Sequence, residues 1–218
     1  MLAIVRVSRR EALREVSALG LNVTAAQSGE IVAALFGYES HAELTADTKD
    51  DVVGSLLEIS ELVVLNEPLA LRRAEALNWA LSPADQKRVV TAAKSAISLG
   101  IEGRPVFDDV QHLYDEWAEK EIIDIAMQSD EVQAQAEELE FPDMDAQPSC
   151  TADLWQSPDE WILYSFGTTK LFVPDGSPQT QSEPIAIYGL IRFRKAGRAG
   201  LMVDFADGGL DPRTRQTH

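Results

Sequence analysis

The sequence predicts an α+β fold, in which an N-terminal helical bundle is followed by a small antiparallel β-sheet. Apolar residues recur every three to four positions between residues 8 and 139, which is the spacing of amphipathic helices. A proline-containing stretch over residues 142–158 interrupts this pattern. Residues 159–206 then hold short runs of β-branched and aromatic side chains, as strands do. Helices first and strands last favour segregated layers over alternating βαβ units.

Three short helices are expected in an N-terminal module, residues 1–48. Ser8 and Thr24 are capping residue types, and each precedes a stretch with helical apolar spacing. Gly20 and Gly37 follow these stretches, and glycine most readily takes the left-handed conformation that ends a helix. The predicted helices cover residues 8–19, 24–36 and 40–46.

A longer helical region with an acidic helix is expected over residues 49–141. Its clearest start signal is Ser82-Pro83-Ala84-Asp85, which supplies a capping hydroxyl, a proline for the first turn and an early acidic side chain. Pro68 can occupy the first turn of another helix in the same way. The predicted helices cover residues 52–63, 68–81, 82–99, 108–126 and 131–139.

The last part of the chain is expected to form the sheet. Residues 142–158 are predicted to be a linker, residues 159–206 the antiparallel strands, and residues 207–218 a tail. The predicted strands cover residues 161–166, 170–173, 185–193 and 201–205, with a basic turn at residues 194–198 between the last two. Whether so small a sheet folds independently stays open.

The negative charge is concentrated in the middle of the chain. The net charge is −17, and residues 108–160 hold 17 acidic side chains and one basic side chain. Such a surface repels phosphate, so nucleic-acid binding is expected, if at all, only through the N-terminus. The charge exceeds what solubility requires, and a basic protein surface is therefore the expected partner.

The composition also bears on the compartment. Cys150 is the single cysteine, which permits neither an intramolecular disulfide nor a zinc site with several cysteines and favours a reducing compartment. The N-terminus lacks the apolar stretch of a signal peptide, and no run approaches the roughly 18 apolar residues of a membrane span. We therefore expect a cytoplasmic protein that does not enter a membrane.

Residues 11–46 match the pattern of a known small module. Leu13-Arg14 leads to Leu19-Gly20-Leu21, and Val23-Thr24 with Gln27 begins a second helix that runs through Ile31-Val32-Ala33-Ala34-Leu35-Phe36-Gly37-Tyr38-Glu39-Ser40-His41 to Leu44. This segment resembles the short helical module of glyoxalase-related proteins, which is often found in plasmid and mobile-element proteins. It departs from that pattern at His41, where tryptophan is expected, and at Ala42, where asparagine is common. The resemblance implies a bacterial mobile element or phage as the source, and it assigns no catalytic residue.

Docking of another protein is the main functional hypothesis. Acidic side chains of the predicted acidic helix would contact a basic partner, and tryptophan is frequent where binding energy concentrates in interfaces. The candidate partner-binding residues are Asp108, Asp109, Asp115, Glu116, Glu119, Asp124, Trp155 and Trp161. A solvated helix face and tryptophans that hold the sheet against the helices are the structural alternatives.

A nucleic-acid-associated regulator is the first alternative function. Its contacts would come from a basic cluster at the start of the chain, Arg6, Arg9, Arg10 and Arg14. Residues 24–46 also have a spacing like that of a helix-turn-helix motif. The helix that would read the bases carries Glu39, Glu43 and Asp47, however, and these have the wrong charge to face phosphate.

A hydrolase is the second alternative. Cys150 or a serine would need a base, which would come from a carboxylate or from one of the three histidines, His41, His112 and His218. Asp108, His112 and Glu116 recur at four-residue steps, but a second acid–histidine pair for a di-metal site is missing. Motifs for nucleotide binding are also missing. We therefore predict no catalytic residue, metal or cofactor, and an adaptor or inhibitor-like role without catalysis. The oligomeric state is left open.

Overall fold

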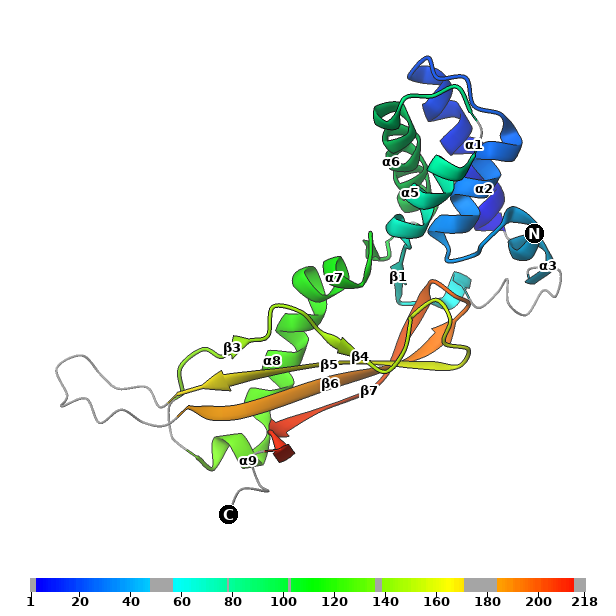
Figure 1. The fold of residues 1–218 in the computed structure, drawn as a ribbon. Helices are drawn as coiled ribbons and strands as arrows, with labels where there is room; N and C mark the ends of the chain where they lie inside the picture. The colour runs from blue at the N-terminus through cyan, green and yellow to red at the C-terminus, as the bar shows by residue number, and fades with distance from the viewer. Residues whose placement is uncertain are drawn as a thin grey trace. The chain divides into compact units, whose positions relative to one another are not determined.

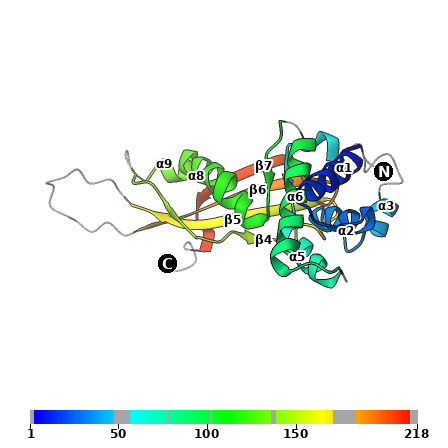
Figure 2. The same cartoon turned by 90° about the horizontal axis from the view of Figure 1, so that it is seen from above.

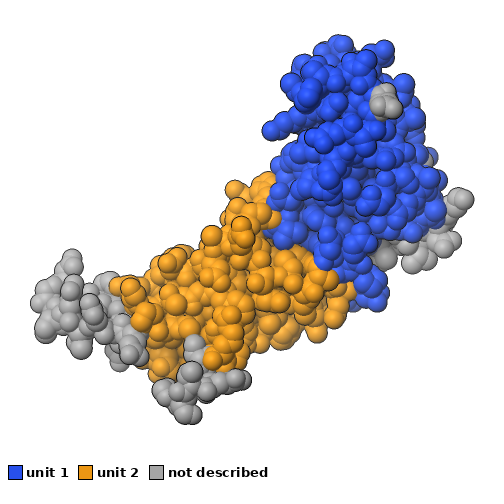
Figure 3. Space-filling model, viewed as in Figure 1, with its two compact units in different colours: residues 1–110, 153–159, 194–202 blue, residues 111–152, 160–193, 203–218 orange. Residues whose placement is uncertain are grey.

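The protein has an α+β fold that divides into two compact units. The computed structural model describes residues 3–47, 57–77, 79–101, 103–135, 139–170 and 184–213 (Figure 1). Unit 1 comprises residues 1–110, 153–159 and 194–202, and unit 2 comprises residues 111–152, 160–193 and 203–218 (Figure 3). Each unit is thus assembled from stretches far apart in the sequence. The boundaries of the two units therefore differ from those of the domains predicted from the sequence, which follow one another along the chain.

Unit 1 contains most of the helices. They are α1 (Ala3–Ala18), α2 (Ala25–Leu35), α3 (His41–Asp47), α5 (Glu67–Ala76) and α6 (Pro83–Gly100). Helix α1 packs along α6, and α2 packs against α5 (Figure 2). Their apolar faces share one core, whose fully buried side chains include Ile31, Leu35, Val90 and Ile97. Burial of these aliphatic side chains supplies the main driving force for folding of this unit.

The predicted caps of α2 and α6 are confirmed. The Gln27 backbone N–H donates to Thr24 Oγ1 at 3.2 Å, and the Thr24 N–H donates to Gln27 Oε1 at 2.9 Å, which completes a capping box. The Asp85 N–H donates to Ser82 Oγ at 3.2 Å. Gly37 ends α2 with a φ of +82°. Short polar side chains before apolar periodic stretches therefore set these boundaries.

The first helix begins earlier than predicted. Ser8 lies inside α1 rather than at its cap, and its side chain is fully buried. A Cβ added to Gly100 would lie 3.2 Å from Ser8 Oγ, so a small residue at the end of α6 permits this approach. Helix α5 is shorter than predicted, since Leu77 is already extended.

Two details of the predicted architecture are wrong. The N-terminal helices do not form a bundle, and strand β1 (Leu62–Val64) lies between α3 and α5 along the chain. The helix predicted over residues 52–63 is also wrong at its end, since Val63 belongs to β1; residues 48–56 lie outside the described residues. Residues 62–64 are all buried, and a short buried run has no periodicity that separates strand from helix.

Within the described residues, the sheet has seven strands and is mixed rather than antiparallel. Besides β1, they are β2 (Val106–Phe107), β3 (Asp143–Met144), β4 (Ser149–Cys150), β5 (Glu160–Thr169), β6 (Ile185–Ala196) and β7 (Gly200–Leu210). The strand order is β2-β1-β7-β6-β5-β3, and β4 also pairs with β5. Strand β1 pairs in parallel with β2, which was not predicted.

The acidic helix predicted over residues 108–126 forms over residues 110–128. It consists of α7 (Val110–Leu113), a π-helical turn η1 (Tyr114–Ala118) and α8 (Glu119–Gln128), and the short α9 (Asp130–Gln133) follows. Helix α8 lies along β5 and β6 (Figures 1 and 2). A Cβ on Gly189 of β6 would lie 2.7 Å from Ile122 Cγ2, so this glycine allows the helix to approach the strand closely.

The predicted linker and tail are partly regular structure. Residues 142–158 contain β3 and β4, whose backbones pair antiparallel with β5. The tail was predicted from residue 207, but β7 continues to Leu210. The predicted strand over residues 170–173 lies outside the described residues except for Lys170. The pairings of β3 and β4 with β5 were not predicted, because the prolines and polar residues of the linker are typical of a loop.

Candidate functional site

The acidic helix of unit 2 carries four of the carboxylates that the sequence analysis names as partner-binding. Asp115, Glu116 and Asp124 are exposed, and Glu119 is half-buried. The opposite side is apolar and buried, with Leu113, Tyr114, Ala118, Ile122, Ile123 and Ala126. None of these four carboxylates forms an ion pair with a basic side chain of the described residues. We call Asp115, Glu116, Glu119 and Asp124 the acidic helical surface.

A buried polar anchor positions this surface within unit 2. Tyr114 Oη lies 2.7 Å from Ser165 Oγ of β5 and donates to the Asp145 carbonyl oxygen at 2.9 Å. Burial raises the pKa of Tyr114, although the hydrogen bond with Ser165 lowers it in part. The phenol is therefore protonated at neutral pH and fixes η1 against the strand.

Asp108 and Asp109 do not belong to the acidic helical surface. Both lie in unit 1, before the boundary at residue 110. Asp108 Oδ2 is 2.7 Å from Lys94 Nζ, which also donates to Glu67 Oε2 at 2.8 Å. Asp108 thus neutralises a cation of its own unit, and we remove it from the partner-binding set, whereas the assignment of Asp109 stays a prediction.

The two candidate tryptophans have structural contacts. Trp161 is fully buried in unit 2, where its indole N–H donates to the Ala152 carbonyl at 3.0 Å and its ring packs on Phe193 at 5.6 Å between centroids. A side chain with no exposed surface offers no contact to a partner, so its assignment as a partner anchor is wrong. Trp155 is half-buried in unit 1 and donates to the Val64 carbonyl at 3.0 Å.

The basic cluster lies along α1. Arg6, Arg10 and Arg14 are exposed and Arg9 is half-buried. Arg14 is 3.5 Å from Glu11, one turn away on the same helix. Exposed pairs of this kind contribute little to stability, so the arginines are available to solvent.

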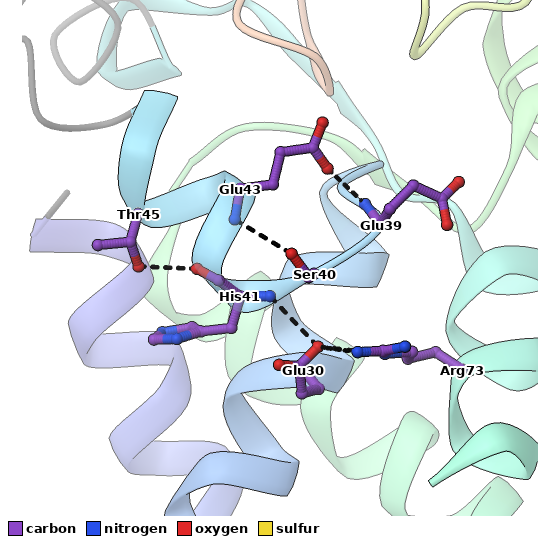
Figure 4. Close-up of polar contacts among 7 residues, drawn as sticks. All are labelled: Glu30, Glu39, Ser40, His41, Glu43, Thr45 and Arg73. Atoms are coloured by element: carbon purple, nitrogen blue, oxygen red, sulfur yellow. Dashed lines mark hydrogen bonds and ion pairs between the residues drawn. The ribbon is translucent and has the colours of Figure 1, made fainter.

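The carboxylates of the resembling helical module hold unit 1 together (Figure 4). Glu30 Oε2 of α2 accepts hydrogen bonds from the Arg73 side chain of α5, the shorter at 2.5 Å, and from the His41 backbone N–H at 3.3 Å. Glu43 accepts from the Glu39 N–H at 2.8 Å. Glu30 and Glu43 therefore make contacts within unit 1. These contacts give no support to the helix-turn-helix hypothesis.

A pocket in unit 1 is a feature that the sequence reasoning did not predict. Its volume is about 640 Å³, and its walls come from the end of α2, the turn at residues 153–159 and the β6–β7 hairpin. The apolar part of the wall comprises Tyr38, Trp155, Pro158 and Met202. Arg198 stacks over the Tyr38 ring at 4.4 Å and donates to Glu43 Oε1 at 2.6 Å, which fixes this wall.

Lys195 is the unusual residue of this pocket. It is 7% exposed, and its ammonium nitrogen donates to the carbonyl oxygens of Leu154 at 2.9 Å and of Arg198 at 2.5 Å. Burial lowers the pKa of Lys195 from 10.5 to about 7, against a smaller upward effect of Asp153. Strand alternation was the available signal, because positions 191, 193 and 195 lie on one buried face of β6.

The histidines that could serve a hydrolase as a base are divided between the two units. His41 belongs to unit 1 and His112 to unit 2, while His218 lies outside the described residues. Burial raises the pKa of Cys150 to about 11, which keeps the thiol protonated. The described residues hold no group of three or more side chains suited to bind a metal ion.

Comparisons with protein families, curated proteins and solved structures found no match for this chain. Among the described residues, no helix is both long and apolar enough to span a membrane. The candidate sites therefore stand on their own geometry: the acidic helical surface of unit 2, the basic cluster on α1 and the pocket around Lys195.

Proposed function

We propose that the protein is a non-catalytic adaptor or inhibitor-like protein, encoded by a bacterial mobile element or phage, that docks a basic protein through its acidic helical surface. The proposed origin rests on the N-terminal resemblance alone. The docking role rests on the carboxylates of η1 and α8.

The observation that carries the proposal is a set of exposed carboxylates without internal counter-ions. Several acidic side chains elsewhere in the protein have such partners, as Glu30 has Arg73 and Asp204 has Arg192 at 2.8 Å. The acidic helical surface lacks them among the described residues, so its field extends into solvent. Lys120 is the one basic side chain in residues 111–135.

A field of this kind selects partners by charge and accelerates their encounter. It is screened over about 8 Å at physiological ionic strength, so partner binding should weaken as salt is added. A phosphate-rich ligand would be repelled by the same field, which favours a basic protein over nucleic acid at this surface.

The test compares two variants that each remove two exposed negative charges. Glu116→Gln combined with Asp124→Asn removes two of the four charges of the acidic helical surface without changing side-chain size. Glu39→Gln combined with Glu75→Gln is the matched control, because both carboxylates are exposed in unit 1. Each immobilised protein is incubated with nuclease-treated bacterial lysate, and the retained proteins are quantified by mass spectrometry.

We expect a defined basic protein to be retained by the wild type and by the control. Its affinity for the first variant should fall about fivefold to thirtyfold, since each of the two exposed charges contributes about 0.5 to 1 kcal/mol. Equal retention by all three proteins would overturn the proposal. Retention that disappears with nuclease, and that Arg9→Glu with Arg10→Glu also abolishes, would establish the nucleic-acid alternative instead.

A further inference from the structure

The pocket of unit 1 holds a primary amine that forms no ion pair with a carboxylate of the described residues, although Asp153 contributes a weaker electrostatic attraction. No side-chain carboxylate of the described residues forms an ion pair with Lys195. An uncompensated charge at 7% exposure is costly, and an amine at such a position reduces the cost by losing its proton.

The hydrogen-bond geometry accommodates a neutral amine as well as an ammonium. A neutral amine has two N–H donors and one lone pair, whereas an ammonium has three donors and no acceptor. Lys195 Nζ has two carbonyl acceptors, Leu154 O and Arg198 O, and the described residues supply no third. Both N–H groups of the neutral form are therefore satisfied, and the lone pair is not used by the protein.

We propose that Lys195 is a carbonyl-reactive amine and that the pocket of unit 1 binds a small aldehyde or ketone with an aromatic or apolar body, which it holds as an imine. The proposal concerns unit 1 and is independent of partner docking through unit 2.

The pocket walls suit such a ligand. Trp155, Tyr38, Pro158 and Met202 form an apolar and aromatic surface, and a volume of about 640 Å³ accommodates a small molecule. The Tyr38 hydroxyl is protonated in this environment, because burial, with a contribution from Asp47, raises the pKa of Tyr38 to about 12. The Tyr38 ring therefore stays neutral across the range in which the amine reacts.

The charges around the amine come from several elements. Arg194 and Arg198 belong to the β6–β7 hairpin, Asp153 and Asp159 to the turn at residues 153–159, and Asp47 to α3. At pH 7 an amine with a pKa of about 7 is about half neutral, whereas a lysine at 10.5 is neutral in roughly one molecule in 3000. Neutral amine is the form that attacks a carbonyl group.

The reaction is balanced without a further reactant. The Nζ lone pair forms a bond to the carbonyl carbon, a proton moves from nitrogen to oxygen, and the resulting carbinolamine loses water to give the imine. Amine and aldehyde thus give imine and water. The step is reversible, and added borohydride traps it by delivering hydride to the imine carbon.

The experiment measures which lysine of the folded chain reacts first. The protein is treated at neutral pH with salicylaldehyde and sodium borohydride, and the rate of adduct formation at each of the six lysines is followed by peptide mass spectrometry. We expect Lys195 to react at least about tenfold faster than the exposed Lys120 and Lys170. A buried structural lysine would instead react more slowly than exposed ones, and that result would overturn the proposal.

Two variants separate the amine from the pocket. Lys195→Arg keeps a cation and its donors but has no nucleophilic amine, so the fast phase should disappear. Gln156→Trp places bulk at an exposed pocket-lining position and should slow labelling of Lys195 about tenfold while leaving Lys120 unchanged. If circular dichroism shows that Lys195→Arg does not fold, the labelling rates of the lysines in the wild type and in Gln156→Trp still test the proposal. Unchanged labelling in Gln156→Trp would place the reaction outside the pocket and overturn the proposal.

Discussion

Replacement of Lys195 by methionine should change how the stability of the protein depends on pH. The unfolded chain keeps this lysine charged up to about its ordinary pKa of 10.5, whereas burial lowers the pKa in the folded protein to about 7. Between these values the unfolded state binds more protons than the folded state. Raising the pH therefore shifts the equilibrium toward the folded state, and the Lys195 contribution is least favourable below pH 7.

The expected magnitude follows from the size of the shift. Each pH unit within this window is worth about 1.4 kcal/mol, and the whole window is worth about 5 kcal/mol. Between about pH 8 and about pH 9.5, the free energy of unfolding of the wild type should rise by about 2 kcal/mol relative to Lys195→Met. Methionine does not titrate, so other groups cancel in this difference.

Urea denaturation followed by tryptophan fluorescence measures both proteins at each pH. Lys120→Met is the matched control, because it removes an exposed lysine from α8 and leaves the unit 1 pocket unchanged. A wild-type minus Lys195→Met difference that stays constant between about pH 8 and about pH 9.5 would refute the reasoning. It would mean that the folded protein keeps the lysine charged, and the carbonyl-binding proposal would lose its chemical basis.

Two further predictions concern glycines that permit close packing. Gly37→Ala should lower the free energy of unfolding by at least about 2 kcal/mol, because its φ is +82° and a Cβ would lie 2.6 Å from Trp155 Cδ1; urea denaturation would contradict this if the loss were below about 0.5 kcal/mol. Gly189→Ala should cost about 1 to 3 kcal/mol in unit 2, because its Cβ would lie 2.7 Å from Ile122 Cγ2. Circular dichroism in urea would detect this, and an unchanged midpoint would show that α8 does not approach β6 so closely.

Local signals in the sequence predicted the helices well and the strand pairings poorly. Thr24, Ser82 and Gly37 act within one turn of the chain, so their caps and stops could be recognised without tertiary information. The pairing of β1 with β2 joins residues about 43 positions apart, and no local pattern encodes it. The acidic helix was recognised from its apolar stripe, but the π-helical turn within it was not.

The candidate site residues also differ in whether they could be predicted from the sequence. Exposed carboxylates on η1 and α8 could be predicted because helical spacing separates polar from apolar faces. Burial of Trp161 could not be predicted, since a tryptophan near a proline is equally typical of an interface and of a core. Lys195 was interpreted as part of a basic turn, although alternation along β6 places it with Ile191 and Phe193 on the buried face.

Hydrogen exchange with mass spectrometry of the complex tests the docking proposal most directly. The chain is measured alone and bound to the protein that it retains from nuclease-treated lysate. We predict that binding slows exchange in peptides covering residues 111–128, the segment that carries the acidic helical surface. Protection confined to α1, with unchanged exchange over residues 111–128, would contradict the account and move the binding site to the arginines of that helix.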